Sequence, residues 1–192
     1  MRGCVTEGKT RRSRGALRRV AGREQILAAA RSIGVRMGWK AVTIRAVARR
    51  LGYTSPLLYE HFRDKEDILT QLAIEGQLCL AKELAKELPK APDAAVLLMV
   101  ERYWSFMLRN KQIYQLMNGM DGVPIDRKKV GSIALGSFEA TKAVVRAWLI
   151  EENAEADRVD VLMDELWLCC MAWPRFTWIV LPHSISDAHK TV

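Results

Sequence analysis

The sequence predicts an all-α fold in two successive helical parts. Between residues 22 and 181, apolar residues recur at the three-to-four-residue spacing of amphipathic helices, and no strand-like alternation occurs. Glycines and prolines separate these helical segments. The 192 residues are 49 % apolar and 27 % charged, a balance typical of a globular chain with a core and not of a fibrous or disordered one. No secretory signal and no run of about 18 apolar residues occurs, which excludes a spanning segment.

The excess positive charge is confined to the first third of the chain. The net charge is +8, but residues 1–66 hold 16 Lys and Arg against 5 Asp and Glu, whereas residues 67–192 hold 14 against 17. This asymmetry predicts a basic N-terminal module with a polyanionic partner, attached to a near-neutral body. Residues 1–21 are expected to be a flexible basic arm.

The first two expected helices end at glycines. The first covers about residues 22–38, with an apolar face made of Ile26, Ala30, Ile33 and Met37. The second begins after Thr43, a good N-cap, and stops at Gly52. Its expected inner face is Ile44, Val47, Ala48 and Leu51.

A very short third helix and a long fourth helix follow. The third begins at Ser55, has Pro56 in its first turn, where a missing N–H costs nothing, and ends near Phe62. Asp64 is expected to cap the fourth, which runs to about Leu88. Its expected buried residues are Ile68, Leu69, Leu72, Gly76, Leu80 and Leu84.

The second half is expected to contain four more helices. Asp93 is the predicted cap of one, whose inner face is Val96, Val100, Tyr103, Trp104 and Met107. A short helix over about 111–118 precedes a loop over 119–126, which has two glycines and a proline. Helices over about 129–152 and 155–181 are apolar on more than one face, with Leu135 on a second stripe, so we expect both to be buried on several sides.

Residues 43–62, TIRAVARRLGYTSPLLYEHF, carry the functional signal. They predict a helix, a tight turn at Gly52 and a second, short helix, with the small Ala48 where the two helices would cross. This is the layout of a helix-turn-helix, whose second helix enters the major groove of DNA.

Residues 25–74 resemble the DNA-binding domain of the tetracycline-repressor (TetR) family of bacterial transcription regulators. The matching residues are Ile26, Ala29, Ala30, Gly38, Thr43, Ile44, Ala48, Leu51, Gly52, Leu58, Tyr59, His61, Phe62, Lys65, Glu66 and Leu69. The resemblance implies an N-terminal three-helix helix-turn-helix DNA-binding domain at 22–66, a C-terminal helical ligand-binding and dimerisation domain at 67–182, and a tail at 183–192.

The resemblance also implies which residues contact DNA. Thr43 and Arg45 would touch phosphates at a helix N-terminus. The full expected set is Thr43, Arg45, Tyr53, Thr54, Ser55, Pro56, Leu57, Tyr59, His61 and Lys65. Arg49 and Arg50 are either phosphate contacts or a solvated face. The arginines of the arm, Arg11, Arg12, Arg14, Arg18 and Arg19, either reach an adjacent minor groove or add non-specific affinity.

Large, adaptable apolar side chains mark the expected effector pocket of the second domain. They are Tyr103, Trp104, Met107, Met117, Met120, Trp148, Met163, Trp167 and Met171, and such groups either line a ligand cavity or fill an ordinary core. Because strongly charged residues are scarce among them, we expect a mostly apolar effector. Where many family members carry Trp-x-x-x-His-Gly, this chain has Met171 and Ala172 after Trp167.

The predicted function is ligand-responsive transcription regulation in the bacterial cytoplasm, associated with the nucleoid. We expect a repressor that binds a palindromic operator as a homodimer, pairs through the helices over 129–152 and 155–181, and is released by a small effector. No enzyme activity, catalytic residue, metal or cofactor is expected, because no phosphate loop, metal cluster or nucleophile–histidine pair occurs. Two alternatives stay open: a redox trigger at Cys169 and Cys170, and a membrane-surface role for the basic arm.

Overall fold

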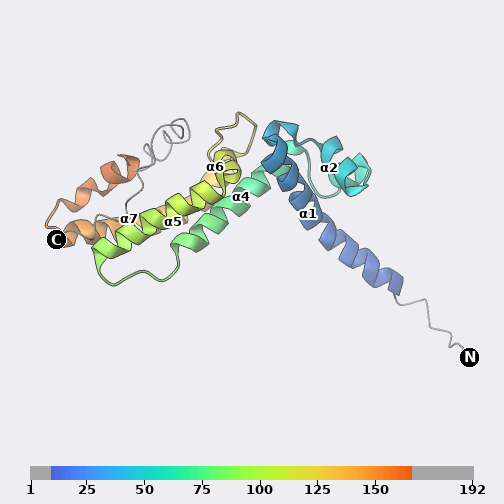
Figure 1. The fold of residues 1–192 in the computed structure, drawn as a ribbon. Coiled ribbons are helices and arrows are strands. Elements are labelled where there is room, and N and C mark those ends of the chain that lie inside the picture. Colours follow the sequence, from blue (N-terminus) through green and yellow to red (C-terminus); the bar gives the residue numbers. More distant parts are fainter. Residues whose placement is uncertain (1–9, 166–192) are drawn as a thin grey trace, which may run out of the picture. The chain divides into compact units, whose positions relative to one another are not determined.

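The computed structural model of the chain describes residues 10–165, and these are helices joined by turns (Figure 1). The predicted all-α class is confirmed. The elements are α1 (Thr10–Met37), the 3₁₀ turn η1 (Trp39–Ala41), α2 (Ile44–Leu51), α3 (Ser55–Tyr59), α4 (Lys65–Leu84), α5 (Pro92–Arg109), α6 (Lys111–Met117), α7 (Arg127–Glu151) and the 3₁₀ turn η2 (Ala156–Arg158). None of these helices is long and apolar enough to cross a membrane.

The chain divides into two compact units, one ending at Thr141 and one beginning at Lys142. The first contains the helix-turn-helix together with α4, α5 and α6, and its buried core is continuous from Ile26 to Val130. The expected domain boundary at 66/67 falls within this unit and stays a prediction. In the second unit, Lys142 pairs with Asp160, and Val145, Leu149, Val159 and Met163 are buried.

The predicted start of the first helix at residue 22 is wrong, because α1 already begins at Thr10 (Figure 1). Residues 10–21 contain no proline, and their arginines, Ala16 and Leu17 are good helix formers. Single glycines such as Gly22 cost a helix about 1 kcal/mol and do not stop it. Met37 was expected to face inward, but it lies in the last turn of α1 and is 73 % exposed.

Three predicted caps are confirmed by their hydrogen bonds. The Thr43 hydroxyl accepts from the Ala46 N–H at 3.1 Å, and the Asp64 carboxylate accepts from the Asp67 N–H at 2.9 Å. Gly52 ends α2 with φ 66° and ψ 29°, the left-handed conformation that a residue with a side chain adopts only at a cost. These local signals are strong because each satisfies backbone groups that a helix end leaves unpaired.

Two helix boundaries differ from the predictions. Helix α4 ends at Leu84, with Ala85 as its C-cap, instead of near Leu88. Helix α5 starts at Pro92 with Ala91 as its N-cap, so Asp93 lies within the first turn instead of capping it.

Leu135 of α7 was expected to be buried and is 58 % exposed. Of the predicted helix over 155–181, residues 159–165 are helical and the remainder lies outside the described residues.

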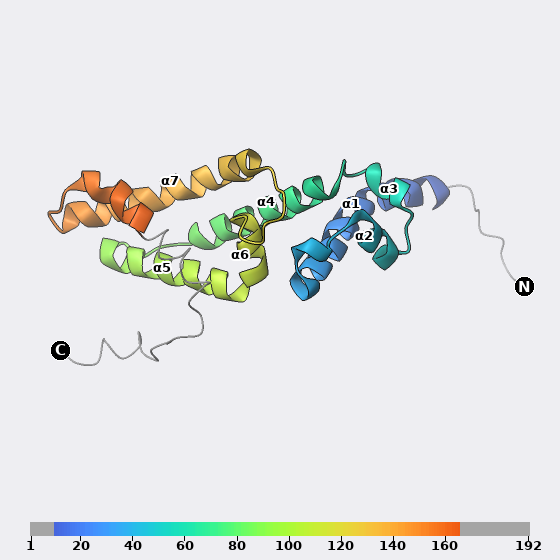
Figure 2. The ribbon, with the colours of Figure 1, turned by 90° about the horizontal axis from the view of Figure 1, so that it is seen from above.

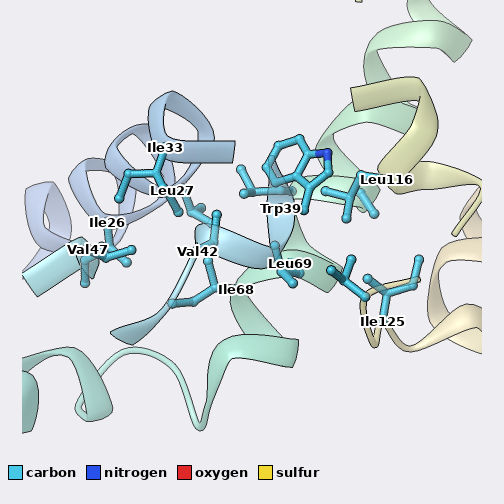
Figure 3. Packing of buried hydrophobic residues seen from close by; sticks show 14 of the residues in the cluster. Ile26, Leu27, Ile33, Trp39, Val42, Val47, Ile68, Leu69, Leu116 and Ile125 are labelled. Atoms are coloured by element: carbon cyan, nitrogen blue, oxygen red, sulfur yellow. The ribbon is translucent and has the colours of Figure 1, made fainter. Parts of the chain in front are cut away.

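Trp39 joins the N-terminal helices to α6. Its side chain is 1 % exposed and lies among Ile33 of α1, Leu69 of α4 and Leu116 of α6 (Figure 3). The indole N–H donates to the backbone oxygen of Gln112 at 2.9 Å. The ring lies directly over Gly34, where a Cβ atom would come within 2.1 Å of it. The 3₁₀ turn that presents Trp39 had no signal in the apolar periodicity.

Two further contacts hold α4 to the segments that follow it. Gly76 is buried against Ile113 and Met117, at a point where a Cβ atom would come within 2.6 Å of either side chain. The buried Thr70 hydroxyl accepts from the Asp126 N–H at 2.9 Å, which fixes the end of the 119–126 loop on α4. The side chain of Asp126 in turn accepts from the Lys129 N–H in the first turn of α7.

We expect Gly34→Ala to destabilise the protein by about 2 kcal/mol, because the added methyl displaces the Trp39 ring and overpacking outweighs the better helix propensity of alanine. Urea unfolding measures the change. Gly131→Ala is the matched control, since nothing lies within 4 Å of its Cβ position in α7. This control should be unchanged or slightly more stable, and equal stabilities of the two variants would contradict the close approach at Gly34.

Asp121 carries the buried carboxylate of the 119–126 loop. Its Oδ2 atom is shielded from solvent and has no hydrogen-bond partner among the described residues. Burial raises the pKa of this carboxyl, and the opposing attraction of Lys40 is the smaller effect. An acid whose pKa is raised by folding destabilises the fold when it is ionised, and this cost disappears when both states are protonated.

Asp121→Asn should therefore be more stable than the parent protein at pH 7, because a neutral amide costs less to bury than a carboxylate. The advantage should shrink as the pH falls through the raised pKa of Asp121 towards the ordinary aspartate value of 3.8. Unfolding free energies measured from about pH 4 to about pH 7 check this. Asp157→Asn, at an exposed position, is the charge-matched control, and a pH-independent difference would contradict the argument.

Candidate nucleic-acid interface

Helices α2 and α3 form the predicted helix-turn-helix (Figure 2). Val47 and Ala48 of α2 are buried against α1, and Leu58 of α3 is fully buried. The turn between the helices is closed by the Tyr53 N–H, which donates to the Ala48 oxygen at 2.9 Å. One face of this pair is thus committed to the core, and the opposite face is available to a partner.

The predicted base-contacting segment lies at the start of α3. Thr54 is its N-cap and makes no side-chain capping bond, Pro56 occupies the first turn, and both are exposed. Tyr59, in the last turn of α3, is 57 % exposed. The exposed side chains of Thr54 and Tyr59 each carry a hydroxyl group, a hydrogen-bond donor that suits phosphate oxygens.

Thr43 and Arg45 lie together at the N-terminus of α2. Both are exposed, and the first-turn amides add the positive end of the helix dipole. Thr43 uses its oxygen as the cap acceptor, which leaves its O–H proton for another acceptor. Arg45 and Arg49 form no ion pair with an acidic side chain in the described part of the chain. This end of α2 is therefore suited to bind an anion.

Three of the sequence-predicted contacts have partners within the protein. The Tyr53 hydroxyl donates to Gln25 Oε1 at 2.8 Å, so its proton is not directed to solvent. The Lys65 ammonium donates to the Lys40 oxygen at 3.1 Å, and burial lowers the pKa of this lysine. The His61 ring lies against Gly22 of α1, where a Cβ atom would come within 2.9 Å of Nε2. These three side chains hold in place the segments around α2 and α3, which are called the reading helices below. Any contact with DNA would use the remaining polar atoms of these side chains.

Sequence reasoning missed the part that α1 has in supporting this site. Arg23 donates to the His61 backbone oxygen at 2.9 Å, and its guanidinium lies 4.4 Å from the centre of the Phe62 ring. Arg50, whose role was left open, donates to the Ser32 hydroxyl at 2.8 Å. The signal for such contacts is weak in a sequence, because polar residues on the outer face of a helix look solvated until a neighbouring segment covers them.

The residues predicted to line an effector pocket lie in several places. The hydroxyl groups of Tyr103 and Tyr114 are 3.0 Å apart, with the rings edge to face, while Met107 and Met117 are buried. Trp104 and Met120 are partly buried in the same unit. Trp148 and Met163 belong to the second compact unit. Trp167, Met171, Cys169 and Cys170 lie outside the described residues, and the effector set stays a prediction.

Comparison with known proteins agrees with this geometry. The model of the family described as bacterial regulatory proteins, tetR family, matches residues 26–72, which run from α1 into α4. This match covers the predicted motif and confirms the resemblance seen in its residues. No curated protein sequence matches the chain.

Solved structures extend the likeness beyond the helix-turn-helix. A protein of unknown function from Rhodococcus sp. RHA1 is 23 % identical, with a TM-score of 0.57, over 76 % of this chain and 93 % of that one. A bacterial regulatory protein in the tetR family from Rhodococcus RHA1 is 20 % identical, with a TM-score of 0.61, over 86 % and 87 %. The fatty acid degradation regulator FadR from Bacillus halodurans is 12 % identical, with a TM-score of 0.62, over 83 % and 87 %.

The helix-turn-helix and the family match over residues 26–72 support the class of DNA-binding transcription regulators. Within that class, the chain carries the N-terminal domain of the TetR family, and the helices that follow have the fold of TetR-family regulators.

We expect Thr43→Val to destabilise the protein by about 1 kcal/mol, because the first turn of α2 loses the acceptor for the Ala46 N–H. Thr43→Ser keeps the hydroxyl and should retain most of the stability. Thermal unfolding of both variants measures the difference. If the valine and serine variants melted at the same temperature, the cap would contribute nothing to the stability of the helix-turn-helix.

Proposed function

We propose that this protein is a ligand-responsive repressor that binds a palindromic operator as a homodimer and is released by a small, mostly apolar effector. The observation that carries the proposal is the capped α2, the left-handed turn at Gly52 and the exposed face of α3, in a segment that matches the tetR family. Two such units related by a two-fold axis would meet two half-sites about 34–36 Å apart.

In the proposed complex, α3 enters the major groove and Thr43 and Arg45 bind the flanking phosphates. Thr54, Ser55, Pro56 and Leu57 are the candidates for base-edge contact, with Leu57 limited to apolar contact with a thymine methyl. Tyr59 would bind the backbone through its exposed hydroxyl. His61, Tyr53 and Lys65 are proposed as backbone contacts. His61 and Tyr53 also hold the helix-turn-helix against α1, and Lys65 holds the start of α4 against η1.

Effector release would be a population shift between two arrangements of the dimer. A ligand that favours the arrangement with the wrong spacing of α3 helices weakens DNA binding by its differential affinity, commonly 1–3 kcal/mol. The route from body to reading helices is physically continuous in the first unit. Helix α6 contacts Trp39 through Gln112, and Trp39 lies four residues before the cap of α2.

The deciding experiment is selection of bound fragments from random and genomic DNA by the full-length protein. A palindromic site, bound by two chains and protected on both strands, is the expected result. A sequence-independent profile would refute operator recognition. Release of that DNA by apolar compounds, but not by charged ones of equal size, would support the effector class.

Arg45→Gln should flatten the salt dependence of operator binding, because each phosphate contact contributes a slope of about 0.9 in log K against log salt. Fluorescence anisotropy over a range of salt concentrations measures this slope. Lys128→Gln, which removes an exposed cation in the first turn of α7, is the charge-matched control and should keep the parental slope. Equal slopes for the two variants would show that Arg45 does not contact a phosphate.

The contribution of the arginines in residues 11–19 is tested by the same salt dependence of operator binding. Replacing Arg11, Arg12, Arg14, Arg18 and Arg19 by glutamine should flatten the slope further, by up to about 0.9 for each phosphate that the segment neutralises. An unchanged slope would show that these charges do not contribute to DNA binding.

A further inference from the structure

A groove of about 350 Å³ crosses the first compact unit outside the helix-turn-helix face. One wall is formed by Arg31 and Val35 of α1. The other is formed by Gly76 and Cys79 of α4 together with the end of α5 and the start of α6. None of the predicted effector residues within the described part of the chain lines this groove.

The groove combines buried and exposed apolar surface. Phe106 is buried, whereas Val35 and Leu108 are 47 % and 58 % exposed. Two large aliphatic side chains exposed on the same concave surface leave apolar area in water that a ligand would cover. Ile113 continues the apolar surface into α6.

The charges around the groove favour an anion. Arg31, Arg109 and Lys111 line it, against the single carboxylate of Glu75. That carboxylate already accepts a hydrogen bond from Arg31. Arg109 uses its Nε for the Ser105 oxygen of its own helix, which leaves the two terminal nitrogens of the guanidinium as donors. Arg109 also attracts Glu83 of α4 at longer range, but neither Arg109 nor Lys111 forms an ion pair within 4.0 Å among the described residues.

We propose that this groove binds a small amphipathic anion, an organic carboxylate or sulfonate that carries an apolar ring or chain. The apolar part would cover Val35, Leu108 and Phe106, and the anionic group would bind Arg109 and Lys111. This site differs from the predicted apolar effector pocket in both place and ligand charge. Because it is read out by binding alone, its test is independent of DNA recognition.

The probe is 8-anilinonaphthalene-1-sulfonate, which joins an aromatic body to an anionic group and fluoresces when its surroundings become apolar. The full-length protein should bind it saturably. The double variant Arg109→Glu/Lys111→Glu should bind it at least about tenfold more weakly, because charge-assisted contacts are replaced by repulsion. Leu108→Gln should weaken binding by several-fold.

Two matched controls distinguish binding at this site from non-specific binding of the probe. Lys128→Glu/Lys129→Glu makes the same charge change on α7, and Leu97→Gln removes an equally exposed leucine of α5 outside the groove. Both should bind the probe like the parent protein. Equal losses in test and control variants, or adventitious unsaturable binding only, would overturn the proposal.

The reactivity of the Cys79 thiol reports whether the probe binds in the groove, because this residue is exposed and lines the groove. In a chain with Cys4, Cys169 and Cys170 replaced by serine, the probe should slow the reaction of Cys79 with an aromatic disulfide reagent in proportion to occupancy. The double variant Arg109→Glu/Lys111→Glu should lose this protection. A Cys79 reaction rate that is unchanged at saturating probe would place the probe elsewhere and overturn the proposal.

Discussion

The packing of Trp39 on Gly34 is the contact on which the arrangement of the first compact unit depends. A ring of this size fits there only because residue 34 has no side chain, and its buried N–H needs the Gln112 carbonyl as an acceptor. These two requirements fix α1, η1 and α6 against one another. The cap of α2 follows four residues later, so the orientation of the reading helices is set close to this contact.

Helix α1 has two roles in this arrangement. Its inner face supplies Ile26, Ala30 and Ile33 to the core. Its polar residues bond outward to the helix-turn-helix, with Gln25 holding Tyr53 and Ser32 holding Arg50. A polar contact of this kind contributes only about 1 kcal/mol, but each one restricts a side chain that would otherwise be mobile. Pre-ordered side chains lose less entropy when a partner binds.

The last turns of α1 also border a second environment. Arg31 and Val35 border the groove against α4, α5 and α6, and Ser32, which bonds to Arg50 of α2, lies between them in the sequence. Any ligand in that groove would contact α1 and the body helices at once. The same helix therefore links the proposed DNA-binding surface and the proposed anion site, without a change in secondary structure being needed to connect them.

Local signals in the sequence were sufficient for the all-α class, the helix-turn-helix and its caps. Thr43, Gly52 and Asp64 act on backbone groups within four residues, so their effect can be read without knowing the fold. The buried face of α4 could also be predicted, since Ile68, Leu69 and Leu72 follow the helical period. Met37 and Leu135, which are exposed, show the limit of prediction from periodicity. Periodicity identifies the apolar face of a helix but does not say whether another segment covers that face.

The tertiary structure alone decided which polar and aromatic residues meet. Nothing near Trp39 in the sequence points to Gln112, 73 residues away, and nothing near Lys65 points to the Lys40 carbonyl. The groove beside Cys79 belongs to the same category. Such features depend on distances between segments remote in the chain. The sequence by itself determines local hydrogen bonding and amphipathic faces, whereas contacts between those faces exist only once the helices have packed.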